Sequence, residues 1–190
     1  GYRLATETVA CATHYARTIA LDSGNESPIV AISGFSMGAG VGTHVALAGE
    51  SFHQIWDEYS APTGEPASKI ECTVDESSTH VDALIGIAGP YDAFVGYEGK
   101  YGRDFLQKHD HGLWELFFGT IGKNPDLKVR LLHSEDDGTI SYENTEKFKN
   151  LLAEAGYDVQ LIPFNGGHKV PHDLTVETIM DVLQTVSVDD

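Results

Sequence analysis

A serine framed by two glycines is the first residue that could carry out chemistry. Gly34, Ser36 and Gly38 form the pattern G-x-S-x-G within "PIVAISGFSMGAG". A serine hydroxyl is a weak nucleophile until a base takes up its proton. His168, in "NGGHKVP", is a candidate for that base. Together these residues indicate nucleophilic attack by an activated hydroxyl, provided that the fold brings them together.

A third group is needed to orient the imidazole. The segment "LLHSEDDGTI" offers three acids, Glu135, Asp136 and Asp137. An acid at this place would hold the histidine in the correct tautomer and stabilise its charged form during the reaction. Sequence reasoning on the residues alone leaves the choice among the three acids open.

The glycines predict a sharp turn between a strand and a helix. Residues 29–33 are apolar and β-branched, which is typical of a strand buried on both faces, and residues 37–49 are typical of a helix. Such a turn would strain Ser36 and push its hydroxyl out of the sheet, and bulky side chains at the two glycine positions would collide. The backbone N–H of Met37, at the start of the helix, would then point to where an oxyanion forms.

The rest of the chain alternates between strand and helix patterns. This alternation predicts an α/β fold, with a mostly parallel sheet and helices on both faces. Strands are expected at 81–88, 127–132 and 157–164, and helices at 5–20, at 142–155 and after Pro171. The helix at 142–155 should begin at the N-cap Ser141 and end at Gly156. The last helix should face the core with four apolar side chains: Val176, Ile179, Met180 and Leu183.

Residues 1–190 are expected to form a single domain with cap-like insertions near 50–80 and 90–126. The first insertion is polar and irregular. The second carries aromatic residues from Tyr91 to Phe118, which would make either a small core of their own or the wall of a substrate pocket.

Composition excludes several classes of partner. The formal net charge of −17 disfavours nucleic acid and anionic membranes, and no apolar run is long enough for a membrane span. Cys11 and Cys72 fit no metal pattern and would be either two thiols or one disulfide. His109 and His111 flank Asp110 without an evident set of further ligands, so neither a metal nor a cofactor is expected.

The chain resembles the C-terminal part of an α/β-hydrolase of the carboxylesterase/lipase type. "GFSMG" is similar to the nucleophile elbow of that family, and residues 131–168 are similar to its acid strand, helix, strand and histidine loop. The family's acid usually stands four residues after a His or Gly that ends the strand. Counting from His133, the resemblance implies Asp137, with Asp136 as the nearest alternative and Glu135 as a more remote one. It also implies that "YRLA" at 2–5 is a strand end.

The resemblance implies a serine hydrolase that acts on a small carboxylic ester through an acyl-enzyme, with a Ser36, Asp137 and His168 triad and the Met37 amide in the oxyanion hole. The family's second oxyanion donor comes from an earlier loop that is missing here, as are the N-terminal strands. We therefore expect a fragment, or an upstream segment or partner chain that completes the sheet. The alternatives are a peptidase or amidase of the prolyl-oligopeptidase type and a non-catalytic binding protein with the same fold.

Overall fold

The strands form one parallel sheet in chain order. The computed structural model describes residues 2–55, 79–91, 95 and 119–186 of the 190 residues. Strands β1 (Ala31–Phe35), β2 (Ala83–Ile87), β3 (Lys128–Ser134) and β4 (Asp158–Phe164) pair in the order β1-β2-β3-β4, each parallel to its neighbour. The prediction of an α/β fold with a parallel sheet is therefore confirmed.

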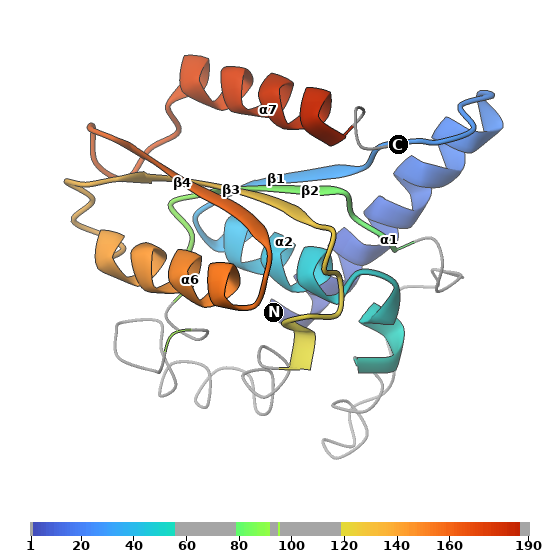
Figure 1. Ribbon diagram of the computed structural model, residues 1–190, viewed down its shortest axis with the longest axis horizontal. Coiled ribbons are helices and arrows are strands. Elements are labelled where there is room, and N and C mark those ends of the chain that lie inside the picture. Colours follow the sequence, from blue (N-terminus) through green and yellow to red (C-terminus); the bar gives the residue numbers. More distant parts are fainter. Residues whose placement is uncertain (1, 56–78, 92–94, 96–118, 187–190) are drawn as a thin grey trace.

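Helices cover both faces of this sheet (Figure 1). Helix α7 (His172–Val186) packs on one face against β2 and β3. On the other face α2 (Met37–Ala48) packs against β1 and β2, and α6 (Tyr142–Glu154) packs against β3 and β4. Helix α1 (Tyr2–Asp22) lies against α2 in an outer position. Residues 2–5 are helical, so the expectation of a strand end there is wrong.

The core between the sheet and α2 depends on a very close approach. A Cβ at Gly42 would lie 2.7 Å from Ile32 Cγ2, so only glycine lets the helix sit this near β1. The fully buried side chains around it belong to one cluster: Val45, Leu47, Leu84, Leu131 and Phe148. This close packing explains why the helix tolerates a glycine at position 42, although glycine weakens a helix.

Helix α6 ends as the sequence predicts. Gly156 follows it with φ +92°, the left-handed conformation that favours glycine after a helix. Ser141 does stand at the N-cap, but its side chain makes no capping hydrogen bond.

Strand β1 is not buried on both faces. Its residues alternate between exposed and half-buried, because among the described residues β1 pairs with β2 alone and so lies at an edge of the sheet. The prediction took its apolar content as a sign of full burial. Ile32, which faces α2, is half-buried, whereas Phe35 remains exposed.

Helix α7 presents a different face to the sheet than its apolar residues suggest. Val176 and Met180 are 57% and 54% exposed, whereas Thr175 and Thr178 are buried with Val182. The two threonine hydroxyls donate to backbone carbonyls one turn earlier, at 2.9 and 2.7 Å. Because these hydroxyls are satisfied within the helix, their methyl groups can face the core at little cost. Ile179 and Leu183, which the sequence predicts to face the core, are partly buried against the cluster that contains Val182, Ile85 and Leu132.

The expected insertions fall mostly on residues 56–78, 92–94 and 96–118, outside the described part of the chain. The described residues at the start of each insertion include side chains that belong to the core. After the short 3-10 turn η1 (Gly49–Ser51), the side chains of Phe52 and Ile55 are buried. Tyr91 is buried and stacks on Phe148 at 4.5 Å, so it is a core residue and not a pocket wall.

Cys11 on α1 is disulfide-bonded, and the other cysteine of the sequence, Cys72, lies outside the described residues. Within the ranges described above, no helix combines the length and the apolar character needed to cross a bilayer.

Candidate active site

The turn that carries Ser36 is as sharp as the sequence predicts. Ser36 lies between β1 and α2 with φ 54° and ψ −125°, a conformation that costs a non-glycine residue about 1–3 kcal/mol. A Cβ at Gly34 would lie 2.5 Å from the carbonyl oxygen of Gly38, so glycine is required there. At Gly38 no described atom lies within 4 Å of such a Cβ. The expected collision at position 38 is therefore wrong, because the backbone of Gly38 is itself the obstacle.

Met37 is the first residue of α2, directly after Ser36. Backbone N–H groups in the first turn of a helix have no carbonyl partner one turn earlier and attract negative charge. The amide of Met37 thus begins a helix N-terminus immediately beside the serine.

His168 bridges Ser36 and Asp137. Its Nε2 lies 2.9 Å from Ser36 Oγ, and its Nδ1 lies 2.8 Å from Asp137 Oδ2. Because the carboxylate can only accept, Nδ1 carries the proton and Nε2 is left free to accept from the hydroxyl. The ring also packs against Phe35, with centroids 4.9 Å apart. The serine, the histidine and one predicted acid therefore form a continuous hydrogen-bonded chain.

Sheet register explains why residues so far apart in the sequence meet. Phe35 is in register with Ile87, Ile87 with Leu132, and Leu132 with Ile162. The carboxyl ends of the four strands therefore lie together at one end of the sheet. Ser36, Asp137 and His168 follow β1, β3 and β4, respectively, at that end of the sheet. Parallel pairing thus converts separation along the chain into proximity.

Asp137 is held by four groups. Its Oδ1 accepts from the backbone N–H groups of Thr139 and Ile140, at 2.8 and 3.1 Å. Its Oδ2 faces two imidazoles, His168 Nδ1 at 2.8 Å and His133 Nε2 at 3.3 Å, and the side chain is shielded from solvent. Burial acts to raise the pKa of Asp137, but the hydrogen bonds from His168 and the two amides outweigh it, so the pKa is lowered and the carboxylate stays charged.

The two neighbouring acids, Asp136 and Glu135, have other hydrogen-bond partners than Asp137. Asp136 Oδ1 accepts from the backbone N–H groups of Gly166 and Gly167, at 2.8 and 2.9 Å, and from Ser134 Oγ. These bonds, that of Ser134 foremost, lower the pKa of Asp136 well below its usual range. Asp136 therefore fastens the loop that carries His168. Glu135 is exposed, and its backbone N–H donates a hydrogen bond to the carbonyl oxygen of Phe164.

Sequence reasoning missed these roles for Asp136 and His133. The sequence did contain a sign of the role of Asp136: the two glycines before His168 have no side chains that would shield their backbone N–H groups from an acceptor. Their positive φ angles, +140° and +72°, also show why glycine is needed there.

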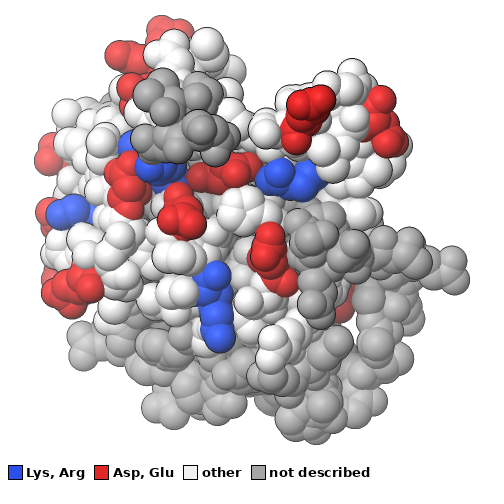
Figure 2. All heavy atoms as spheres, turned by 45° about the vertical axis from the view of Figure 1, so that its right-hand side comes forward, with Lys and Arg blue, Asp and Glu red and all other residues white. Residues whose placement is uncertain are grey.

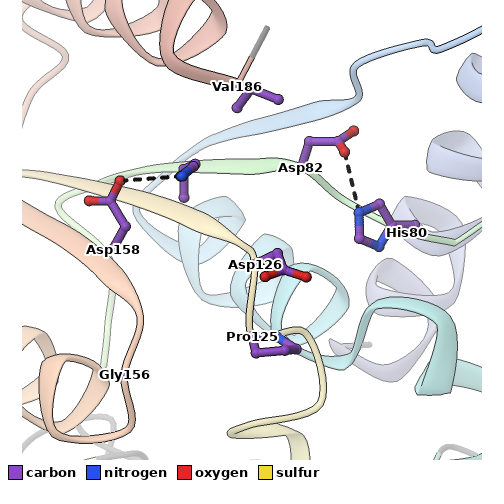
Figure 3. A pocket seen from close by; sticks show the side chains of 8 residues that line it. His80, Asp82, Pro125, Asp126, Gly156, Asp158 and Val186 are labelled. Atoms are coloured by element: carbon purple, nitrogen blue, oxygen red, sulfur yellow. Dashed lines mark ion pairs between the residues drawn. The ribbon is translucent and has the colours of Figure 1, made fainter. Parts of the chain in front are cut away.

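A hollow lies at the end of the sheet opposite to Ser36, His168 and Asp137 (Figure 3). It measures about 540 Å³ and is lined by residues at or just before the amino ends of β2, β3 and β4: His80, Asp82, Pro125, Asp126, Lys128, Gly156 and Asp158, with Val186. Asp82 pairs with Arg17 at 2.9 Å and lies 3.3 Å from His80, and Asp158 pairs with Arg130 at 3.0 Å.

Figure 2 turns the right-hand side of Figure 1 forward and shows basic and acidic side chains side by side on this face. Among the described residues no cluster of three or more His, Cys, Asp or Glu could hold a metal ion. Two of the acids that line the hollow, Asp82 and Asp158, are thus paired with arginines.

Comparisons with known proteins show that the chain shares its fold with solved structures. No protein-family model matches the sequence, and no curated protein matches it either. Solved structures do. A truncated carbohydrate esterase from gut microbiota is 17% identical with a TM-score of 0.61, over 94% of this chain and 68% of that one.

Esterase 2 of Thermogutta terrifontis, phosphoramylated by tabun, is 16% identical with a TM-score of 0.61, over 96% of this chain and 65% of that one. An acetyl ester-xyloside bifunctional hydrolase from Caldicellulosiruptor lactoaceticus is 16% identical with a TM-score of 0.60, over 96% and 64%. The chain thus spans about two thirds of the length of these structures, whose fold it shares.

Proposed function

We propose that this chain carries the catalytic residues of a serine hydrolase of the α/β-hydrolase type that cleaves carboxylic esters. The observation that carries the proposal is the hydrogen-bonded chain from Ser36 Oγ through the His168 imidazole to Asp137, at 2.9 and 2.8 Å. The resemblance of the fold to three esterases supports an ester as the bond cleaved.

In the proposed reaction Ser36 Oγ attacks the ester carbonyl carbon while His168 Nε2 takes the hydroxyl proton. The carbonyl oxygen becomes an oxyanion, which the Met37 amide at the start of α2 would stabilise. Collapse of this intermediate breaks the bond to the alcohol, which leaves with the proton from Nε2. Water then attacks the acyl-serine by the same route, and the carboxylic acid and free Ser36 are released.

Asp137 fits the role of the orienting acid. It accepts from His168 Nδ1 and so fixes the tautomer in which Nε2 is a base. Its lowered pKa keeps it charged, so it can stabilise the imidazolium formed during the attack. Two exposed apolar side chains, Phe35 at 36% and Met37 at 37%, flank Ser36 and favour an apolar group on the substrate.

The test is hydrolysis of short p-nitrophenyl esters by the wild type and by Ser36→Ala. We expect kcat to fall by about 10⁶-fold, as when the nucleophile of a triad is removed. Ser23→Ala is the matched control, because this serine lies exposed in the turn after α1 and its hydroxyl donates to the carbonyl oxygen of Ala20, far from the proposed site. Esterase activity that survives in Ser36→Ala would refute the proposal. Anilides of the same acyl groups, run in parallel, would reveal an amidase.

A further inference from the structure

A second histidine contacts the proposed orienting acid. His133 is the second-to-last residue of β3, and its side chain is fully buried. Its Nε2 is 3.3 Å from Asp137 Oδ2, the same oxygen that His168 contacts. Asp137 therefore lies between two imidazoles, of which only one reaches Ser36.

The surroundings of His133 determine where its proton lies. Nε2 faces two acceptors, the carbonyl oxygen of Ile140 at 3.2 Å and the carboxylate of Asp137. Nδ1 lies 2.5 Å from Thr145 Oγ1 on α6, a hydroxyl that can donate. A neutral ring satisfies all three partners only with the proton on Nε2.

Burial keeps this ring neutral. It lowers the pKa of His133, and the nearby positive charge that forms on His168 lowers it further, while Ile140 and Asp137 act in the opposite direction. From α6 the ring of Tyr142 packs edge-on at 5.8 Å. Among the described residues, the titratable groups near His133 are thus the carboxylate of Asp137, the imidazole of His168 and the phenol of Tyr142. The other polar groups that face its ring are the Thr145 hydroxyl and the Ile140 carbonyl.

We infer that His133 is a positioning residue, which fixes Oδ2 of Asp137 toward His168 and tempers the negative charge that His168 meets. The inference rests on the proposed function of Asp137. The two backbone amides hold Oδ1, and His133 supplies a second donor, beside His168, to the other oxygen. The hydrogen bond from His133 Nε2–H also draws some negative charge away from the Asp137 carboxylate. That charge would otherwise favour protonation of His168.

Two variants separate this role from simple packing. In His133→Gln the amide nitrogen can occupy the place of Nε2 and still donate to Asp137. In His133→Asn the shorter side chain reaches toward Thr145 but not toward Asp137. We expect kcat for esters to fall by about tenfold in His133→Asn, the usual effect of one lost hydrogen bond to a charged group, and to recover largely in His133→Gln.

The pH dependence provides the readout that a purely structural role would not change. In His133→Asn we expect the acidic limb of the kcat/KM profile to move to higher pH, because an untempered Asp137 favours protonated His168. The NMR titration of the His168 ring should move in the same direction whether or not the protein turns over an ester. If the limb and the titration stay in place while only stability falls, the inference is wrong.

A measurement on the unmodified protein guards against variants that fail to fold. Nitrogen chemical shifts should show His133 as the neutral tautomer with its proton on Nε2 throughout the active pH range. A proton on Nδ1 would overturn the inference. Because this readout needs no turnover, failure of the proposed function and failure of the inference remain distinguishable.

Discussion

In the described part of the chain, histidine–aspartate pairs lie at opposite ends of one sheet. At the carboxyl ends, His168 and Asp137 are 2.8 Å apart, and the free imidazole nitrogen faces Ser36. At the amino ends, His80 and Asp82 are 3.3 Å apart, and Asp82 also accepts from Arg17 and from the backbone N–H of Val30.

The difference lies in what balances the carboxylate. The guanidinium of Arg17 permanently neutralises Asp82, and their ion pair ties α1 to the start of β2. Backbone amides and imidazoles hold Asp137, which leaves its charge available to an imidazolium that forms only during reaction. A histidine–aspartate pair becomes a candidate for catalysis when its acid has no fixed cation and its histidine meets a hydroxyl.

The largest effect that separates the two pairs should come from amide substitution of the acids. In Asp137→Asn the amide can donate to His168, which favours the wrong tautomer, and we expect kcat to fall by about 10⁴-fold. Asp82→Asn should keep kcat within about twofold while it lowers the free energy of unfolding, since Arg17 loses the carboxylate with which it forms an ion pair. Steady-state kinetics and urea unfolding of both variants measure this. Equal losses of activity would contradict the distinction.

A second contrast concerns the strained serine, which the amino-end pair lacks. In Gly34→Ala the new Cβ would press on the backbone of Gly38 and Ala39, so we expect a loss of about 1–3 kcal/mol in unfolding free energy and about 10²-fold in kcat. Gly38→Ala adds a methyl group where no described atom is near. It should stabilise α2 by up to about 1 kcal/mol. Matched thermal unfolding and ester kinetics would show this, and equal destabilisation by both substitutions would argue against the turn described.

The smallest effect is expected for Asp136, which holds the loop and not the imidazole. Asp136→Asn weakens the bonds to Gly166 and Gly167, and we expect a loss of about tenfold in kcat. Because the pKa of Asp136 is lowered in the folded protein, its contribution to stability is present above the ordinary aspartate pKa of about 4 and is lost as the pH falls below it.

Unfolding curves of the wild type and Asp136→Asn should therefore converge at acidic pH, with Glu135→Gln as the exposed control. Curves that stay equally far apart at every pH would show that the charge of Asp136 is not what holds the loop.

The sequence was informative wherever a residue's role follows from backbone geometry. The glycine at position 34 predicts the turn, and the position of His168 after a strand predicts where its ring will lie. The choice of Asp137 over Asp136 came from a family resemblance, since both follow the same strand. What separates them is a pair of amides on another loop, and such a contact exists only after the chain has closed.

Burial was harder to predict for a related reason. Apolar residues predict the buried face of a helix only when no other side chains of the helix can pack against the core in their place. The threonines of α7 satisfy their own hydroxyls and take the core face from Val176 and Met180. Residues 31–35 lie at the edge of the sheet, which their apolar composition cannot reveal. Neighbours in space decide these outcomes.

The most direct test of the account is covalent labelling with a fluorophosphonate, followed by peptide mass spectrometry. We predict a single adduct on the peptide that contains Ser36, abolished in Ser36→Ala and strongly reduced in His168→Ala, while His80→Ala labels like the wild type. A wild-type protein that folds but forms no adduct at Ser36, or one that labels equally without His168, would contradict the central claim.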